Sequence, residues 1–82
     1  MAAITTWNGY QSVVFEGEEI GAARGFDVYY RFFRNAAGGI TVCYTEHDGF
    51  ECVTRLYEFS NLDEVAATNG VFLLALRLAK LA

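Results

Sequence analysis

The chain has 82 residues, of which 54% are apolar and 16% aromatic, and it carries a formal net charge of −4. This composition is typical of one folded domain and excludes a disordered tail, and the acidity argues against direct binding to nucleic acid. No basic and apolar leader opens the sequence, and no apolar run approaches the ~20 residues that span a membrane. We therefore expect a single cytoplasmic domain over residues 1–82, without membrane contact.

Turn-forming residues recur at short intervals along the first three quarters of the chain, and no proline interrupts it. Between them, runs rich in Val, Ile, Thr, Tyr and Phe predict an antiparallel β-meander of four to six strands. The expected strands cover residues 3–7, 10–15, 18–24, 26–34, 40–46 and 50–58. The Asn8-Gly9 pair suits a type I′ turn and predicts the first hairpin.

The segment RGFDVYYRFFR, residues 24–34, alternates arginines with aromatic rings. Its opening Arg-Gly-Phe resembles the aromatic strand signature of RNA-recognition domains, whose rings stack on bases. Asp27 departs from that signature, and the sequence predicts no second crossover helix. We therefore interpret the segment as a central structural strand with one core face, formed by Phe26, Val28, Tyr30 and Phe32. On its other face we expect a partly exposed protein-contact patch, formed by Tyr29, Arg31 and Phe33.

Residues 40–58 predict a hairpin with two alternative loop lengths. A two-residue Asp48-Gly49 turn places Glu46 opposite Glu51, whereas a three-residue loop with a left-handed Gly49 places Glu46 opposite Phe50. We favour the longer loop because it gathers an apolar set on one face, namely Ile40, Val42, Tyr44, Phe50, Cys52 and Leu56. In neither register do the two cysteines oppose each other, so we expect free, buried thiols.

Residues 60–82 predict a C-terminal helix packed on one face of the sheet, which makes the fold class α+β. Ser60 or Asn61 can cap its start, and Asn69-Gly70 predicts a kink or a division into two pieces. The apolar side chains span an arc of about 220°, twice the stripe that docks on a sheet. These side chains are Val65, Val71, Phe72, Leu74, Ala75, Leu76, Leu78, Ala79 and Leu81. A twofold homodimer that packs helix on helix is the simplest cover for the excess.

No group of residues in the sequence has the spacing of a catalytic or metal site. Glu46, His47, Asp48 and Glu51 lie near one hairpin tip, but without a metal-ligand pattern. Cys43 and His47 would lie roughly 13 Å apart along one strand, too far for proton transfer. We therefore expect no enzyme activity, no cofactor and no metal.

Acidic residues gather in the segments FEGEE at 15–19, TEHDGFE at 45–51 and LDE at 62–64. Carboxylates displayed on a small rigid sheet can imitate a phosphate backbone and occupy the basic groove of a nucleic-acid-binding protein. In size, charge and lack of a catalytic motif, the chain resembles small phage-encoded inhibitors of the anti-CRISPR kind. That resemblance implies stoichiometric binding to a subunit of the interference complex, commonly blocking its target DNA.

On this hypothesis the expected partner-binding residues are Glu16, Glu18, Glu19, Glu46, Asp48 and Glu51, together with Tyr29, Arg31 and Phe33. The main alternative is a homodimeric structural or accessory subunit of a cellular complex. In that case the aromatic strand and the helix are the protein interfaces. A third alternative is a small-molecule-binding domain with its ligand between sheet and helix, lined by Tyr30, Phe32, Tyr44 and Tyr57.

Overall fold

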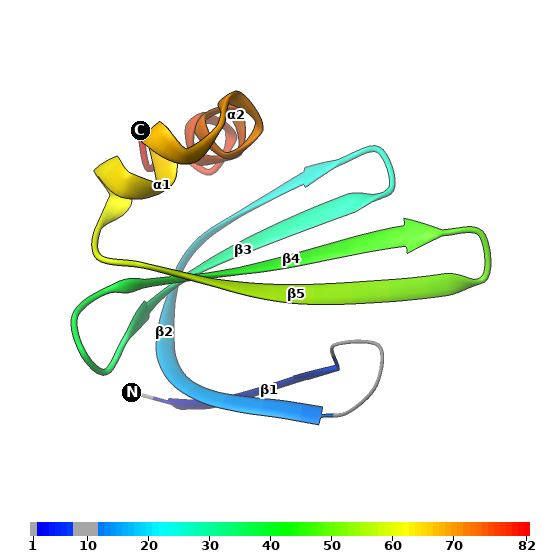
Figure 1. Cartoon of the computed structure of the whole chain (residues 1–82), viewed down its shortest axis with the longest axis horizontal. Coiled ribbons are helices and arrows are strands. Elements are labelled where there is room, and N and C mark those ends of the chain that lie inside the picture. The colour runs from blue at the N-terminus through cyan, green and yellow to red at the C-terminus, as the bar shows by residue number, and fades with distance from the viewer. Residues whose placement is uncertain (1, 8–11) are drawn as a thin grey trace.

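The fold is an α+β arrangement of one five-stranded antiparallel sheet and two short C-terminal helices (Figure 1). The computed structural model describes residues 2–7 and 12–82. The strands are β1 (Ala2–Trp7), β2 (Ser12–Gly25), β3 (Val28–Asn35), β4 (Ile40–Asp48) and β5 (Glu51–Phe59), and the helices are α1 (Leu62–Thr68) and α2 (Gly70–Leu78). Each strand pairs with the next in the order β1-β2-β3-β4-β5, which confirms the predicted meander.

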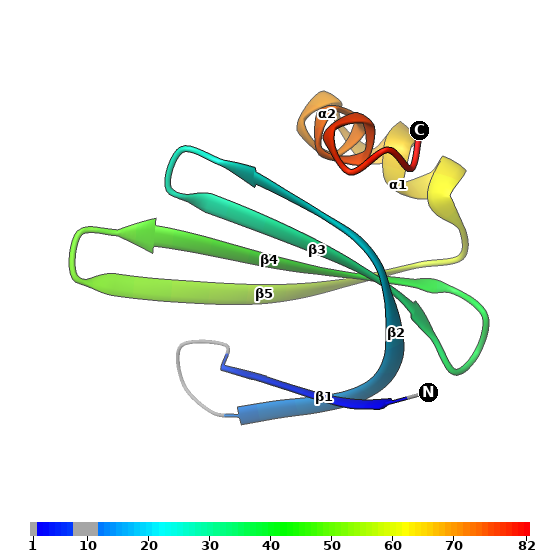
Figure 2. The same cartoon turned by 180° about the vertical axis from the view of Figure 1, so that it is seen from behind.

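The two strands predicted at 10–15 and 18–24 are wrong as separate elements, because they form the single 14-residue strand β2. Its first half pairs with β1 and its second half with β3, with a register shift between Glu19 and Gly21. β2 bends strongly along its length, so β1 and the first half of β2 turn beneath the sheet (Figures 1 and 2). The predicted turn at Asn8-Gly9 lies outside the described residues.

The predicted register of the 40–58 hairpin is wrong. The strands pair Asp48 with Glu51 and Glu46 with Val53, so the two-residue turn consists of Gly49 and Phe50. Gly49 does adopt the left-handed conformation, at a φ of 61°. The observed register differs from the favoured one by three residues, and an odd shift turns every side chain of β5 to the other face. The residues of β5 that face the helices are therefore Tyr57 and Phe59, in place of Leu56 and Cys52.

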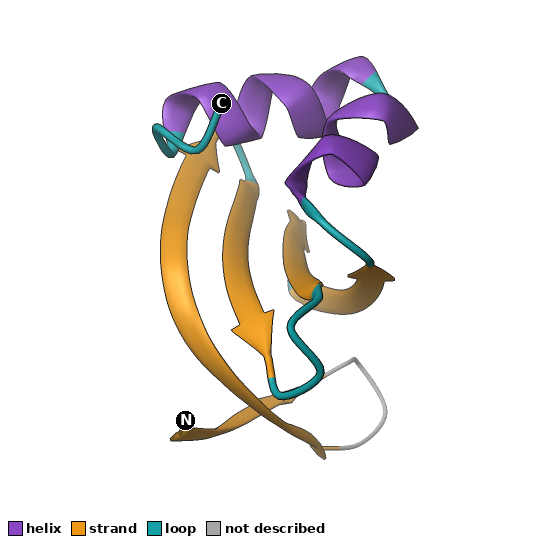
Figure 3. Cartoon of the chain, turned by 90° about the vertical axis from the view of Figure 1, so that its left-hand side faces the viewer, coloured by secondary structure: helices purple, strands orange, loops and turns teal. Residues whose placement is uncertain are grey.

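The main core lies between the sheet and the helices, on what we call the helix face (Figure 3). Asn69 has an extended backbone, ends α1 and caps α2 by accepting a hydrogen bond from the Phe72 amide, so the predicted weak point divides the helix. Asn61 caps α1 in the same way. The core unites buried residues of β2, β3 and β4 with those of both helices: Ala23, Tyr30, Phe32, Ile40, Val42, Val65, Phe72, Ala75 and Leu76.

The opposite side of the sheet, which we call the inner face, is partly covered by the bent β1–β2 hairpin. The ring of Phe15 on β2 packs edge-on against Phe33 of β3, with 5.1 Å between ring centroids. Phe33 is fully buried as a result, so its predicted partial exposure is wrong. Thr6 of β1 reaches Cys43 of β4, with 3.9 Å between Oγ1 and Sγ. The inner face is thus a second packed layer at one end and an open groove at the other.

Candidate interaction site

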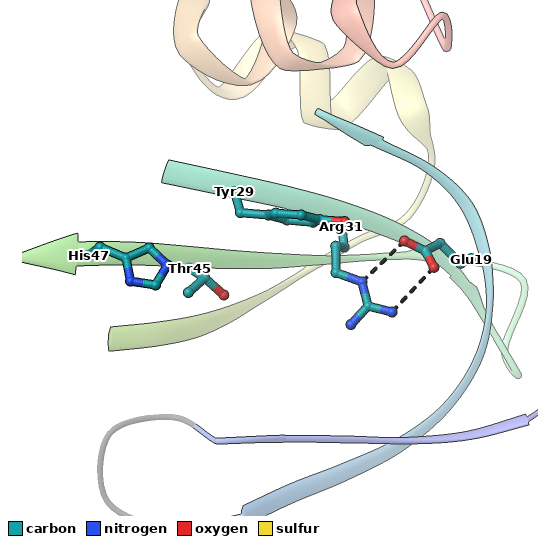
Figure 4. A pocket seen from close by; sticks show the side chains of 5 residues that line it. All are labelled: Glu19, Tyr29, Arg31, Thr45 and His47. Carbon is teal, nitrogen blue, oxygen red and sulfur yellow. Dashed lines mark hydrogen bonds and ion pairs between the residues drawn. The ribbon is translucent and has the colours of Figure 1, made fainter. Parts of the chain in front are cut away.

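The open part of the inner face forms a groove of about 310 Å³ whose walls come from β2, β3 and β4 (Figure 4). Its lining residues are Glu19, Tyr29, Arg31, Thr45 and His47. Antiparallel register brings them together, because Arg31 lies next to Cys43, and Tyr29 next to Thr45. The structure therefore gathers three of the predicted partner-binding residues, Glu19, Tyr29 and Arg31, in one place.

An ion pair dominates the groove. The Arg31 guanidinium donates from Nε and Nη2 to the two carboxylate oxygens of Glu19, at 3.1 and 3.2 Å. The hydrogen bond to Glu19 raises the pKa of Arg31, while its partial burial acts in the opposite direction. Because the two side chains remain 34% and 40% exposed, the pair contributes at most about 1 kcal/mol to stability. Glu19 is thus engaged with Arg31 through both of its carboxylate oxygens.

Cys43 lies on the inner face and is buried, whereas Cys52 is exposed, so the expectation of two buried thiols is wrong for Cys52. Burial is the main cause that raises the pKa of the Cys43 thiol, although its neighbours Thr6 and Arg31 act against it. A thiol with a raised pKa stays protonated at neutral pH and is a weak nucleophile.

The predicted acidic contact residues occupy separate places on the sheet. Glu16 and Glu18 are exposed on the face of β2 opposite to Glu19, since successive side chains of a strand alternate. Glu46 is exposed on the helix face at the far end of β4, where it is level with Val28. Glu18 is level with Arg34, which lies six residues after Val28 on β3. Roughly 20 Å along the sheet therefore separate Glu18 from Glu46.

The remaining two acidic residues of the prediction, Asp48 and Glu51, pair with each other across the β4–β5 turn through their backbones. Between them stands Phe50, which is fully exposed with a relative accessibility of 109%. Phe26, in the β2–β3 turn, is 93% exposed, so its predicted place on a core face is wrong. β3 begins only at Val28, and Phe26 therefore belongs to the turn.

Helix α2 presents an apolar stripe to solvent, as its wide apolar arc predicts. Val71, Leu74 and Leu78 are 57–60% exposed, whereas Phe72, Ala75 and Leu76 of the same helix are buried against the sheet. The spacing of the exposed set, three and then four residues, places it along one side of the helix.

The space between sheet and helices, which would hold the ligand of a small-molecule-binding domain, is filled by aromatic rings. Phe72 of α2 stands edge-on against Tyr30 and Tyr57, at centroid distances of 5.9 and 5.5 Å. Tyr30 in turn contacts Tyr44 at 5.1 Å and is buried. The residues expected to line a ligand site are therefore core residues.

Of the described side chains, no three from His, Cys, Asp or Glu come close enough to hold a metal ion. Within residues 2–7 and 12–82, no helix has the length and apolarity needed to cross a membrane. The sequence matches no protein-family model, and comparisons with curated proteins and with solved structures find no similar chain.

Proposed function

We propose that the protein is a small, noncatalytic interaction protein that binds a subunit of a nucleic-acid-binding complex and inhibits it stoichiometrically, in the manner of an anti-CRISPR protein. The observation that supports this proposal is the neighbouring pair of exposed carboxylates of Glu16 and Glu18 on β2. Among the side chains that the structure describes, the only ion pair joins Glu19 and Arg31, so neither of these two carboxylates forms an ion pair with a described side chain. Such charges are available to a basic partner.

Glu16 and Glu18 are the centre of this proposed contact. They lie two residues apart on one strand, so about 7 Å separates their Cα atoms and both carboxylates project from the same face. β2 is paired on both sides, with β1 and with β3, and this pairing holds the two charges at a fixed spacing. A rigid pair of negative charges can compete with phosphates for lysine and arginine side chains.

The test is affinity capture from a bacterial lysate by the immobilised protein, followed by mass spectrometry. Binding is repeated with duplex DNA as a competitor and at raised salt. We expect to recover a nucleic-acid-binding complex that DNA or salt releases, because both weaken contacts between carboxylates and a basic groove. A partner that resists both treatments would contradict the proposal.

Two variants with equal net charge sharpen this test. Glu16→Gln/Glu18→Gln and Ala67→Lys/Ala82→Lys both change the net charge from −4 to about −2, but only the first alters the proposed contact. Ala67 and Ala82 are exposed and lie in or after the helices. We expect the first variant to weaken capture about tenfold or more and the second to leave it nearly unchanged.

A second candidate function, a homodimeric structural or accessory subunit, is favoured by the exposed stripe on α2. In an antiparallel pair of α2 helices related by a twofold axis, Leu74 would meet its own copy and Val71 would meet Leu78 of the second copy. Sedimentation analysis of the wild type and of Leu74→Asp, with Val14→Asp as the exposed apolar control, separates this function from the first. A dimer that only Leu74→Asp dissociates would support it.

A further inference from the structure

The two most exposed aromatic side chains of the described structure lie at the same end of the sheet. Phe26 is in the β2–β3 turn and Phe50 in the β4–β5 turn, and both turns lie at one end of the molecule (Figure 1). Two strand spacings separate the turns laterally, or about 10 Å. We call these two turns, residues 25–28 and 48–51, the aromatic end.

Both phenylalanines lie in tight two-residue turns. Gly25 of β2 pairs with Val28 of β3, so Phe26 and Asp27 form the first turn, and Asp27 has a φ of 61°. The Asp27 carbonyl accepts a hydrogen bond of 2.8 Å from the His47 amide, which ties this turn to β4. In the second turn the left-handed residue is Gly49, next to Phe50. The turns therefore place the backbone of each phenylalanine at the tip of a hairpin.

These rings contribute nothing to the core of the domain. An exposed phenylalanine that stands alone on a surface needs no explanation, but two at neighbouring tips provide a pair of large apolar anchors. Aromatic anchors that are buried in pockets of a partner dominate the affinity of many protein interfaces. A rigid presentation lowers the entropic cost of that burial.

The charge around the rings indicates the kind of partner. The two turns and the adjoining strand ends carry Asp27, Glu46, Asp48 and Glu51 against the single base Arg24, which is a net charge of −3. Arg24 is itself engaged, because its guanidinium lies 4.7 Å from the centre of the Tyr29 ring. A hollow of about 230 Å³ beside the first turn, lined by residues that include Arg24, Asp27 and His47, offers room for a partner side chain.

We infer that the aromatic end is a protein-docking surface, in which Phe26 and Phe50 enter apolar pockets of a partner and the surrounding carboxylates meet lysine and arginine side chains on its rim. This inference rests on the proposed function, the binding of a basic protein, and names the end of the molecule that anchors it. A lipid surface fits less well, because anionic headgroups would repel the acidic rim.

The test places the photoreactive residue p-benzoylphenylalanine at position 26 or 50 of the full chain, and at positions 74 and 78 as controls. Leu74 and Leu78 are also exposed apolar residues, but they lie on α2, away from the turns and from Glu16 and Glu18. The four proteins are expressed in bacteria, irradiated, and their adducts identified by mass spectrometry. We expect positions 26 and 50 to label one and the same basic protein, and positions 74 and 78 to label it much less.

Affinity for the labelled protein is then measured by calorimetry with Phe26→Ser/Phe50→Ser and with the control Leu74→Ser. Burying one phenylalanine is worth about ten- to a hundredfold in affinity, so the double variant should bind at least about a hundredfold more weakly than the control. Thermal unfolding should not change, because neither ring is packed in the fold.

The outcomes separate the failure of this inference from the failure of the proposed function. Adducts only at position 74 or 78 would overturn the aromatic end as the docking surface and leave binding to a partner intact. Adducts to a protein without a basic surface would overturn the inference that the partner is a basic protein. No adduct at any position would overturn both proposals. Flotation with phosphatidylcholine vesicles that depends on the two phenylalanines would overturn the protein partner in favour of a bilayer.

Discussion

Two leucines of α2 that are two residues apart should respond to truncation in opposite ways. Leu76 is fully buried against the sheet, whereas Leu74 is 57% exposed. Leu76→Ala removes core packing and leaves a cavity, at a cost of about 2–5 kcal/mol. A domain of this length has a total stability of about 4–12 kcal/mol, so the change should lower Tm by roughly 10 °C or more. Leu74→Ala should stay within about 0.5 kcal/mol.

Urea unfolding followed by circular dichroism measures both changes, at a low protein concentration and at one a hundredfold higher. Equal losses at low concentration would refute the docking of α2 through Phe72, Ala75 and Leu76. A loss for Leu74→Ala that appears only at high concentration would instead show that this stripe is buried between two copies, because dimer stability depends on concentration.

Three further predictions concern the turn between β3 and β4, the two cysteine thiols and the hydroxyl of the buried Tyr30. Gly39→Ala should cost about 2 kcal/mol or more in denaturant unfolding, because its Cβ would stand 2.6 Å from a backbone carbonyl oxygen of β5. Gly38→Ala, at a φ of 85° in open space, should cost only about 1–2 kcal/mol. A larger loss of stability for Gly38→Ala than for Gly39→Ala would contradict the observed geometry of this turn. A thiol reagent should label Cys52 quickly in the native protein and Cys43 only after unfolding, and equal rates would contradict the burial of Cys43. Burial raises the pKa of Tyr30 above its ordinary value of 10.0. The unfolded chain therefore loses this proton first, so stability is complete below about pH 10 and falls as pH rises through the folded pKa, by at most about 1.4 kcal/mol per pH unit. A Tm that does not fall between about pH 9 and pH 11 would contradict this.

Local signals in the sequence predict most of the elements. Alternating β-branched and aromatic runs predict β3 and β4 to within a few residues, because a half-buried strand needs that pattern. Asn61 and the Asn69-Gly70 pair predict where the helices begin and divide, since asparagine caps helix starts through its side chain. The over-wide apolar arc of the C-terminal segment predicts the exposed stripe of α2.

The features that sequence reasoning missed depend on contacts between distant residues. The burial of Phe33 requires Phe15, and their contact exists only because β2 bends across the inner face. The register of β5 is set by Tyr57 and Phe59 packing against Phe72, which outweighs the apolar face that Leu56 suggested.

The candidate site was predictable in part. The sequence identified Tyr29 and Arg31 as neighbours on one face, but pairing of Arg31 with Glu19 needs the register of β2 against β3. The exposure of Phe26 had a local signal in the following aspartate, because Asp27 tolerates the left-handed conformation that a two-residue turn requires.

We propose that the protein inhibits a nucleic-acid-binding complex by occupying its basic surface. A titration of DNA binding by the captured complex tests this, with increasing amounts of the wild-type protein or of Glu16→Gln/Glu18→Gln. We expect the wild type to abolish DNA binding near one equivalent and the variant to require about tenfold more. DNA binding that persists at a large excess of the wild-type protein would contradict it.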